Sequence, residues 1–141
     1  MQPVISSFTF SEDSQNSTNQ NGRGNALHVI NPQNLFRPPF IPCTFSFSVT
    51  FGVISLNPNI DSSLEFRLIS PNQEVVVSTN EVNIPKNSNF DSTLPEEANG
   101  FMFNFDFRNV PLRESGKYTA NILINEEVIG EFPLMVHPKE N

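Results

Sequence analysis

The chain has 141 residues, of which 16% are charged, and its formal net charge at pH 7 is −7. A single domain of this length buries enough surface to form a hydrophobic core without metals or disulfides. The negative charge argues against binding to nucleic-acid backbones or anionic membrane surfaces, and the 8 basic residues are scattered along the sequence.

The residue types favour strands over helices. The chain contains 12 prolines, and Asn, Ser and Pro, all abundant here, favour turns and disfavour helix interiors. It also contains 14 phenylalanines, one tyrosine and no tryptophan. Because phenylalanine has no polar group, we expect most of these rings in the core, and an exposed apolar patch is the alternative for a minority of them.

The N-terminal part is predicted to contain two strands on either side of a polar segment. Residues 4–10 form the first predicted strand, and residues 26–30 form a short second one. Residues 11–25, which contain no apolar side chain, are predicted to form a flexible loop. Prolines then mark residues 31–42 as an extended connection.

The clearest strand signal covers residues 43–53, where apolar residues alternate with small hydroxyl residues. Residues 101–107 repeat this pattern, with phenylalanine at every second position. Alternation with a period of two places all the apolar side chains on one side of an extended backbone. We therefore expect one face of each strand to pack on the core and the other to face water.

Four further strands are predicted: residues 64–68, 74–79, 118–124 and 128–136. The turn at residues 70–73 makes the first two a hairpin, and residues 80–99 are a long irregular loop. Pro133 cannot donate a ladder hydrogen bond, so the last strand is expected at a sheet edge or with a bulge there. With seven or eight strands in total, we predict an all-β, two-sheet antiparallel sandwich over residues 1–141, with a barrel as the alternative.

The segment from Glu114 to Tyr118 (Glu-Ser-Gly-Lys-Tyr) resembles the tyrosine corner of immunoglobulin-like domains. In that motif the tyrosine hydroxyl donates a hydrogen bond to the backbone a few residues upstream. The resemblance implies an immunoglobulin-like sandwich. It also places Ala120 where antibody-type domains have their second cysteine and Cys43 at the position of the first, so it implies no disulfide.

The chain also resembles an uncharacterised family of small bacterial single-domain proteins, found in chromosomes and mobile elements. The matching segments are Arg37-Pro38-Pro39, residues 64–72, and Gly116-Lys117-Tyr118 through Leu134-Met135-Val136. Because this family has no assigned activity, the resemblance implies a β-sandwich of unknown function and no site residue.

No catalytic, cofactor-binding or metal-binding residue is assigned from the sequence. A Cys–His nucleophile would need Cys43 beside His28 or His137, but Cys43 is expected on the apolar face of its strand. Two histidines and one cysteine are also a poor set of zinc ligands. The lone cysteine predicts a reducing, cytoplasmic location.

Two sets of acidic residues are weaker candidates. One loop carries side chains with oxygen ligands for calcium, without the spacing of an EF-hand: Asp91, Glu96, Glu97 and Asn99. Asp106 and Glu65 project from the polar faces of two strands, and a glycosidase-type carboxylate pair would require them to share a cleft. We expect both sets to be ordinary surface groups.

The lack of a concentrated catalytic set favours a non-catalytic, cytosolic protein-interaction module on a β scaffold. The partner is an unknown protein or a second copy of the chain, paired through an edge strand such as the one that contains Pro133, and neither nucleic acid nor membrane is expected. Two alternatives are a structural or accessory protein of a phage or mobile element, and a carbohydrate- or calcium-binding, lectin-like domain that uses residues 80–99.

Overall fold

The computed structural model describes residues 2–18, 25–88 and 90–139. Within these ranges the chain forms one short 3-10 helix, η1 (Glu96–Ala98), and no helix long and apolar enough to span a membrane. The strands in the same ranges are β1 (Val4–Thr18), β2 (Asn25–Gln33), β3 (Leu35–Phe36), β4 (Cys43–Ile54), β5 (Ser62–Ile69), β6 (Val75–Ser78), β7 (Val82–Ile84), β8 (Gly100–Leu112), β9 (Gly116–Ile124) and β10 (Glu127–Val136).

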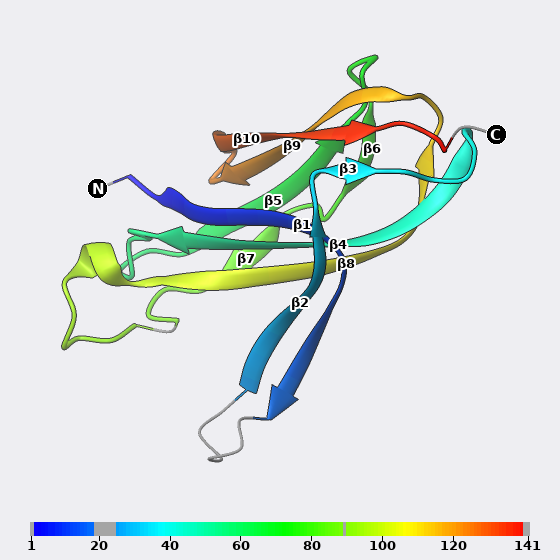
Figure 1. Cartoon of the computed structure of the whole chain (residues 1–141). Coiled ribbons are helices and arrows are strands. Elements are labelled where there is room, and N and C mark those ends of the chain that lie inside the picture. The colour runs from blue at the N-terminus through cyan, green and yellow to red at the C-terminus, as the bar shows by residue number, and fades with distance from the viewer. Residues whose placement is uncertain (1, 19–24, 89, 140–141) are drawn as a thin grey trace.

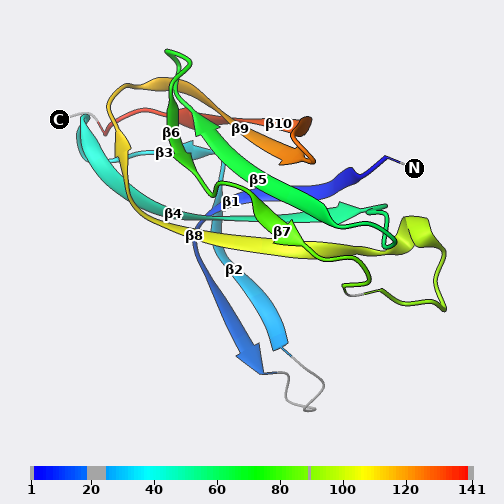
Figure 2. The same ribbon diagram turned by 180° about the vertical axis from the view of Figure 1, so that it is seen from behind.

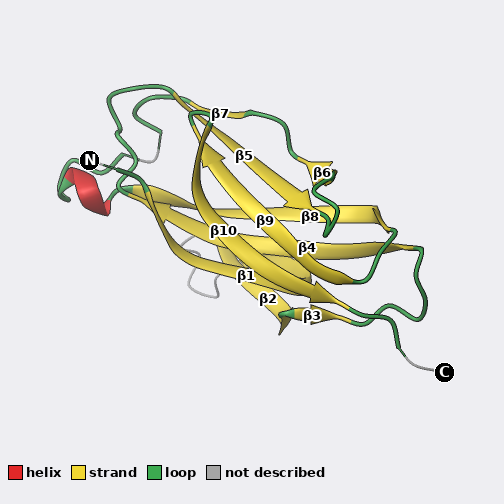
Figure 3. Cartoon of the chain, turned by 90° about the horizontal axis from the view of Figure 1, so that it is seen from above, coloured by secondary structure: helices red, strands yellow, loops and turns green. Residues whose placement is uncertain are grey.

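The strands form two sheets that pack face to face (Figure 1, Figure 3). Sheet A has the strand order β2-β1-β4-β8, and sheet B has the order β3-β10-β9-β5-β6, with β7 also paired to β5. The ladders are antiparallel except for the two-residue parallel pair of β3 with β10. The predicted all-β, two-sheet antiparallel sandwich is confirmed, and β3 and β7 are short strands that the sequence did not predict.

The core lies between the two sheets and is built by the alternating faces of their central strands. Buried and half-buried residues alternate along the whole of β5, where Leu64, Phe66 and Leu68 have no exposed surface. From sheet A, Val49 and Phe51 of β4 are equally buried. The apolar residues of this alternating pattern therefore supply the core of both sheets, as predicted for β4.

The prediction of a flexible loop at residues 11–25 is wrong at every one of these positions that the structure describes. Residues 11–18 continue β1, and they pair with β2 from Ser11↔Pro32 to Thr18↔Asn25; residues 19–24 lie outside the described residues. The two strands form an arm that projects from the body of the sandwich (Figure 1). Both faces of this part of β1 are polar, so the segment has no apolar periodicity by which a strand is recognised.

The base of the arm is fastened to the outer face of sheet A by hydroxyl groups. The Ser14 hydroxyl donates to Oδ1 of Asp106 on β8 across 3.0 Å, and the Ser48 hydroxyl of β4 donates to the same oxygen. Ser48 is only 1% exposed and Thr50 only 5%. The outward, polar face of β4 was expected to face water, but near the arm it is covered.

Residues 80–99 contain β7 and η1 and otherwise lack regular structure at the described positions. Asn99, which is 6% exposed, closes the end of this segment. Its Oδ1 accepts a hydrogen bond from the backbone N–H of Asp91 (2.8 Å), and its Nδ2 donates to the Pro95 carbonyl (3.2 Å). The side chain of Asn99 therefore holds the loop together from within.

The tyrosine corner implied by the resemblance is present. Tyr118 is fully buried at the start of β9, and its hydroxyl donates to the backbone carbonyl of Glu114 across 2.7 Å. Burial raises the pKa of Tyr118, since the phenolate would lose its hydration. The neutral hydroxyl is thus held as a hydrogen-bond donor that ties the β8–β9 connection to the core.

Replacing Tyr118 with phenylalanine is expected to lower the free energy of unfolding by about 1 kcal/mol, because one buried hydrogen bond is lost while the ring still packs. Urea denaturation followed by circular dichroism measures this loss. A Tyr118→Phe protein as stable as the wild type would contradict a stabilising role for the corner.

Candidate functional site

The two sheets leave an open seam where β1 of sheet A runs beside β10 of sheet B. Strand β2 pairs with β1 only from Phe10 onward, and β3 pairs with β10 only at Met135 and Val136. In the described ranges, residues 4–9 of β1 and residues 127–134 of β10 therefore have a ladder partner on one side only. Two strand edges with unpaired backbone groups face the same gap.

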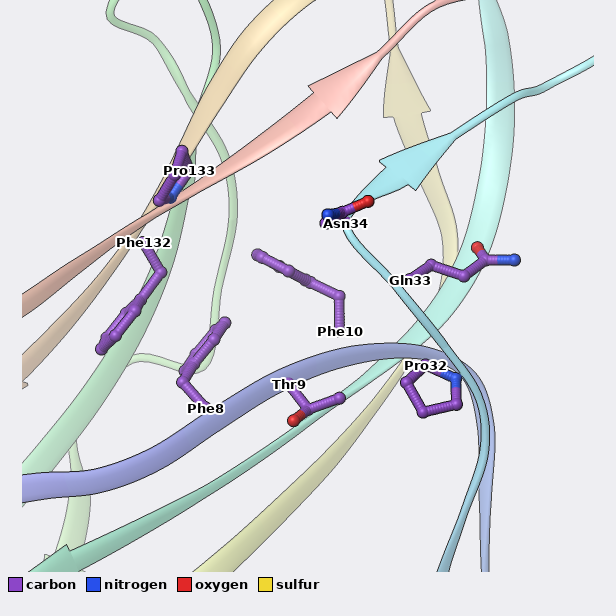
Figure 4. Close-up of a pocket in the computed structure, with 8 residues that line it drawn as sticks. All are labelled: Phe8, Thr9, Phe10, Pro32, Gln33, Asn34, Phe132 and Pro133. Atoms are coloured by element: carbon purple, nitrogen blue, oxygen red, sulfur yellow. The ribbon is translucent and has the colours of Figure 1, made fainter.

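A groove with a volume of about 420 Å³ lies in this seam. Figure 4 shows its lining, which comes from β1, the end of β2 and β10: Phe8, Thr9, Phe10, Pro32, Gln33, Asn34, Phe132 and Pro133. None of these side chains is charged. The volume is in the range of protein pockets that hold a small ligand or a few side chains of a partner.

Three phenylalanines form the floor of the groove and join the two sheets. The rings of Phe8 and Phe132 are stacked, with their centroids 4.2 Å apart and their planes within 1°. Phe10, which is 4% exposed, meets the Phe8 ring edge-on at 4.9 Å. Because Phe10 also contacts the buried Phe36 at 6.0 Å, the floor continues into the core and is held rigid by it.

Pro133 lies where the unpaired edge of β10 borders the groove. The backbone N–H of Met135 donates to the Asn34 carbonyl on the β3 side of β10 (3.1 Å). Residues two apart in a strand point their N–H groups the same way, so the Pro133 nitrogen and the Glu131 N–H also face the seam. β10 as a whole lies between β3 and β9, but at Pro133 it is paired only with β9, so this part of the strand is an edge and no ladder donor is required there.

A second hollow of about 400 Å³ adjoins the groove and shares Asn34 and Pro133 with it. Leu35, Met135 and His137 complete its lining. Met135 and Leu35 are 38% and 37% exposed. The two hollows together follow the edge of β10 from Phe132 to Met135.

The structure places the predicted nucleophile and its histidine candidates on separate elements. Cys43 begins β4, opposite Leu112 of β8, whereas His28 lies on the arm and His137 follows β10. Burial raises the pKa of the Cys43 thiol, which reduces its thiolate fraction. In the described part of the chain, no three His, Cys, Asp or Glu side chains are grouped so that they could hold a metal ion.

The two candidate carboxylates of a glycosidase-type pair lie on opposite outer faces of the sandwich. Asp106 faces the arm on sheet A, where it accepts hydrogen bonds from serine hydroxyls. Glu65 is on the outer face of sheet B, where the Arg67 guanidinium donates to it across 2.6 Å and the Ser78 hydroxyl across 2.9 Å. The hydrogen bond from Arg67 is the main reason that the pKa of Glu65 is lowered.

The oxygen-bearing side chains of the 80–99 loop are engaged with one another and with neighbouring chain. The Asp91 carboxylate accepts hydrogen bonds from the hydroxyl and the backbone N–H of Thr93, which lower its pKa. Oε1 of Glu96 accepts from the Asn59 amide across 3.4 Å. The contacts within residues 91–99 close turns, and the contact of Glu96 with Asn59 joins this loop to the turn at residues 57–59.

The sequence missed the groove, because its lining comes from three segments that meet only in the folded chain. Pro133 was the one signal, since a proline inside an alternating strand marks an edge. The stacked pair of Phe8 and Phe132 could not be anticipated, because the two residues belong to separate predicted strands, residues 4–10 and 128–136.

Residues 13–137 match the model of a family that is described as a family of unknown function (DUF6941). No curated protein matches the chain.

Two solved structures are similar in shape. One is an alkylpurine DNA glycosylase, AlkC, of Pseudomonas fluorescens bound to DNA with an abasic-site analogue (TM-score 0.45, 9% identity); the match covers 74% of this chain and only 28% of the glycosylase. The other is an immunoglobulin-like protein from Pseudomonas aeruginosa (TM-score 0.39, 7% identity), with 97% of this chain and 98% of that chain covered. Likenesses this distant carry no argument about function.

Proposed function

Because the chain belongs to this family of unknown function, we propose its function from its own geometry: it is a non-catalytic protein-interaction module that binds an extended peptide segment of a partner protein in the seam groove. One observation carries the proposal. Two strand edges with unpaired backbone groups, those of β1 and β10, face the same apolar groove. Extended peptides bind such edges by adding a strand, with backbone hydrogen bonds for affinity and side-chain pockets for specificity.

The existing pairing of β3 supports a direction for the bound segment. β3 is parallel to β10 and covers only Met135 and Val136. A peptide parallel to β10 would extend that ladder toward Glu131, where the backbone N–H and carbonyl both face the seam. At Pro133 only the backbone carbonyl is available, as a hydrogen-bond acceptor. A backbone N–H of the peptide would donate to it, and no peptide carbonyl is needed opposite the proline nitrogen.

The lining of the groove supports an uncharged ligand side chain. The floor consists of phenyl rings, and the rim is formed by prolines and by the amides of Gln33 and Asn34. An apolar side chain placed against Phe8 and Phe132 would leave water without leaving a charge unpaired. Lysine or glutamate at the same position would lose hydration with no opposite charge in the lining.

Selection of displayed random dodecapeptides on the full chain, followed by fluorescence-anisotropy titration, tests this function. We expect selected peptides to bind the wild type and to lose at least about tenfold in affinity to an Asn34→Arg variant. Asn34 is exposed at the rim, and a long arginine side chain there obstructs the groove. The bound peptide should also shift the backbone NMR signals of Thr9 and Glu131.

An Asn72→Arg variant is the matched control, since Asn72 is exposed in the β5–β6 turn and the change in charge is the same. It should bind the peptides as the wild type does. Equal binding by both arginine variants, or a selection that yields no binding peptide, would overturn the proposed function.

A further inference from the structure

Most sheet edges of this protein carry a feature that discourages pairing with another strand. Pro133 interrupts the edge of β10, and β3 has two residues. β6 has four residues, with a register shift in its ladder to β5. β2 contains Pro32 and has a positive φ of 54° at Asn31. Proline, irregular backbone and short length are the usual means of protecting an edge.

The edge of β8, by contrast, is long and regular. β8 spans 13 residues and pairs with β4 without a shift from Phe47↔Phe107 to Ile54↔Gly100. Its irregular features, a φ of 54° at Asn109 and the proline at position 111, lie beyond this stretch. β8 is the outer strand of sheet A, beside β4 (Figure 2). Alternate residues of an antiparallel strand point their N–H and C=O groups away from the partner, so residues 101–108 present a regular row of such groups on the side away from β4.

The same stretch carries a ladder of phenyl rings that the sandwich covers only in part. The Phe103 and Phe105 rings are stacked with centroids 6.4 Å apart, and Phe101 and Phe107 continue the row at 5.7 and 6.3 Å. All four rings are half-buried, whereas Phe51 beside them on β4 is fully buried. A strand paired with the free edge of β8 would extend the core-facing side of sheet A and cover the exposed sides of these rings.

We propose that β8 is a homodimer interface, at which β8 of a second copy pairs antiparallel with it in a register centred on Asn104. In this register Phe101 faces Phe107 of the second copy, and Phe103 faces Phe105. In this register all four phenylalanines face a phenylalanine across a two-fold axis. Aromatic pairs directly opposite each other on neighbouring strands stabilise a sheet. Shifting by two residues in either direction places one ring of each copy opposite an asparagine.

The side chains of β8 that meet on its outer face are compatible with the same register. Asn104 faces Asn104 of the second copy, and Asp106 faces Met102, which is 61% exposed. No like charges stand directly opposite each other, although both a carboxylate and a guanidinium lie in the stretch. Self-pairing therefore costs no charge repulsion of the kind that protects exposed edges.

The exposed area of the chain agrees with a missing partner. The chain exposes 8379 Å², against about 7,300 Å² for a compact monomer of its mass. The excess is similar to the roughly 800 Å² that each partner contributes to a standard interface. The projecting arm and the half-covered face of β8 both add to the exposed area.

Sedimentation velocity of the full wild-type chain over a range of concentrations, from about 2 to 200 µM, and disulfide trapping test this interface. In a Cys43→Ala background, Asn104→Cys places two thiols at the two-fold axis, where paired Cα atoms are about 5 Å apart. Met102→Cys is the control on the same face, because its two copies are displaced by four residues, about 13 Å, too far to bridge. We expect dimer formation by the wild type and covalent dimers at least about tenfold faster with Asn104→Cys than with Met102→Cys.

A wild type that sediments as a monomer at every concentration overturns the interface, whatever the variants do. Equal trapping of the two cysteine variants overturns the register. The seam groove and β8 lie on opposite sides of β4, so the Asn34→Arg variant should dimerise as the wild type does. Loss of the dimer in that variant would place the contact at the seam and also overturn the proposal.

Discussion

Replacing Phe51 with alanine is expected to lower the free energy of unfolding by about 3–5 kcal/mol, the usual cost of removing a fully buried phenylalanine ring. Phe51 has no exposed surface. Its ring contacts Phe8 at 5.9 Å and Phe103 at 5.3 Å between centroids. The loss is large because these neighbours belong to different strands of sheet A, and the strands cannot collapse into the space without breaking their ladders to β4.

Phe40→Ala is the control for this substitution. Phe40 is 64% exposed, so its removal should change the free energy of unfolding by no more than about 0.5 kcal/mol. Urea denaturation monitored by circular dichroism gives both values. Because the Phe8 ring also forms the groove floor, Phe51→Ala should weaken peptide binding as well. A loss below about 1 kcal/mol at Phe51 would contradict the assignment of this ring to the centre of the core.

The strands that the sequence predicted well are those in which apolar and polar residues alternate. β4 and β8 were recognised because apolar residues occupy every second position, and this alternation places all of them on the face toward the core. The tyrosine corner was recognisable for a different reason. Gly116 has a φ of 130°, which favours glycine, and the tyrosine two positions later reaches back to Glu114, so the motif is local in sequence.

The β1 part of the arm escaped prediction because nothing in its composition depends on burial. From Glu12 to Thr18 the residues are polar on both faces, as in a loop, and the ladder is held by backbone hydrogen bonds to β2 and by the contact of Ser14 with Asp106. An isolated two-stranded hairpin is only marginally stable in water. The strand character of this segment thus depends on a carboxylate more than 90 residues away in the sequence, which no local pattern reveals.

The candidate site was harder to predict than the fold because it too depends on contacts between residues far apart in the sequence. A groove forms where two sheets fail to close, and this depends on where β2 leaves β1 and where β3 joins β10. Both points are set by tertiary contacts, such as the burial of Phe36, the β3 residue that pairs with Val136 of β10. The sequence showed that Pro133 marks an edge, but not which other edge lies across from it.

Replacing Gly100 with alanine is expected to destabilise the protein by about 3 kcal/mol, near the upper end of the cost of overpacking. Gly100 begins β8 opposite Ile54. A Cβ at this position would lie 2.8 Å from the Cα of Ile54 and from the carbonyl carbon of Val53, and closer still to the Val53 carbonyl oxygen. All three are backbone atoms of β4, so the clash can be relieved only by separating the two strands at this end.

Gly52→Ala separates this explanation from a general intolerance of larger residues in sheet A. A Cβ at Gly52 would meet the Ser6 hydroxyl oxygen at 2.5 Å and the Met102 sulfur at 2.9 Å, and both are ends of side chains that can rotate away. Its expected cost is about 1 kcal/mol or less. Denaturation curves give the two losses, and hydrogen exchange should show faster opening of β8 amides only in Gly100→Ala. Similar losses in both variants would mean that the close approach of backbones at Gly100 does not determine how β8 joins the sheet.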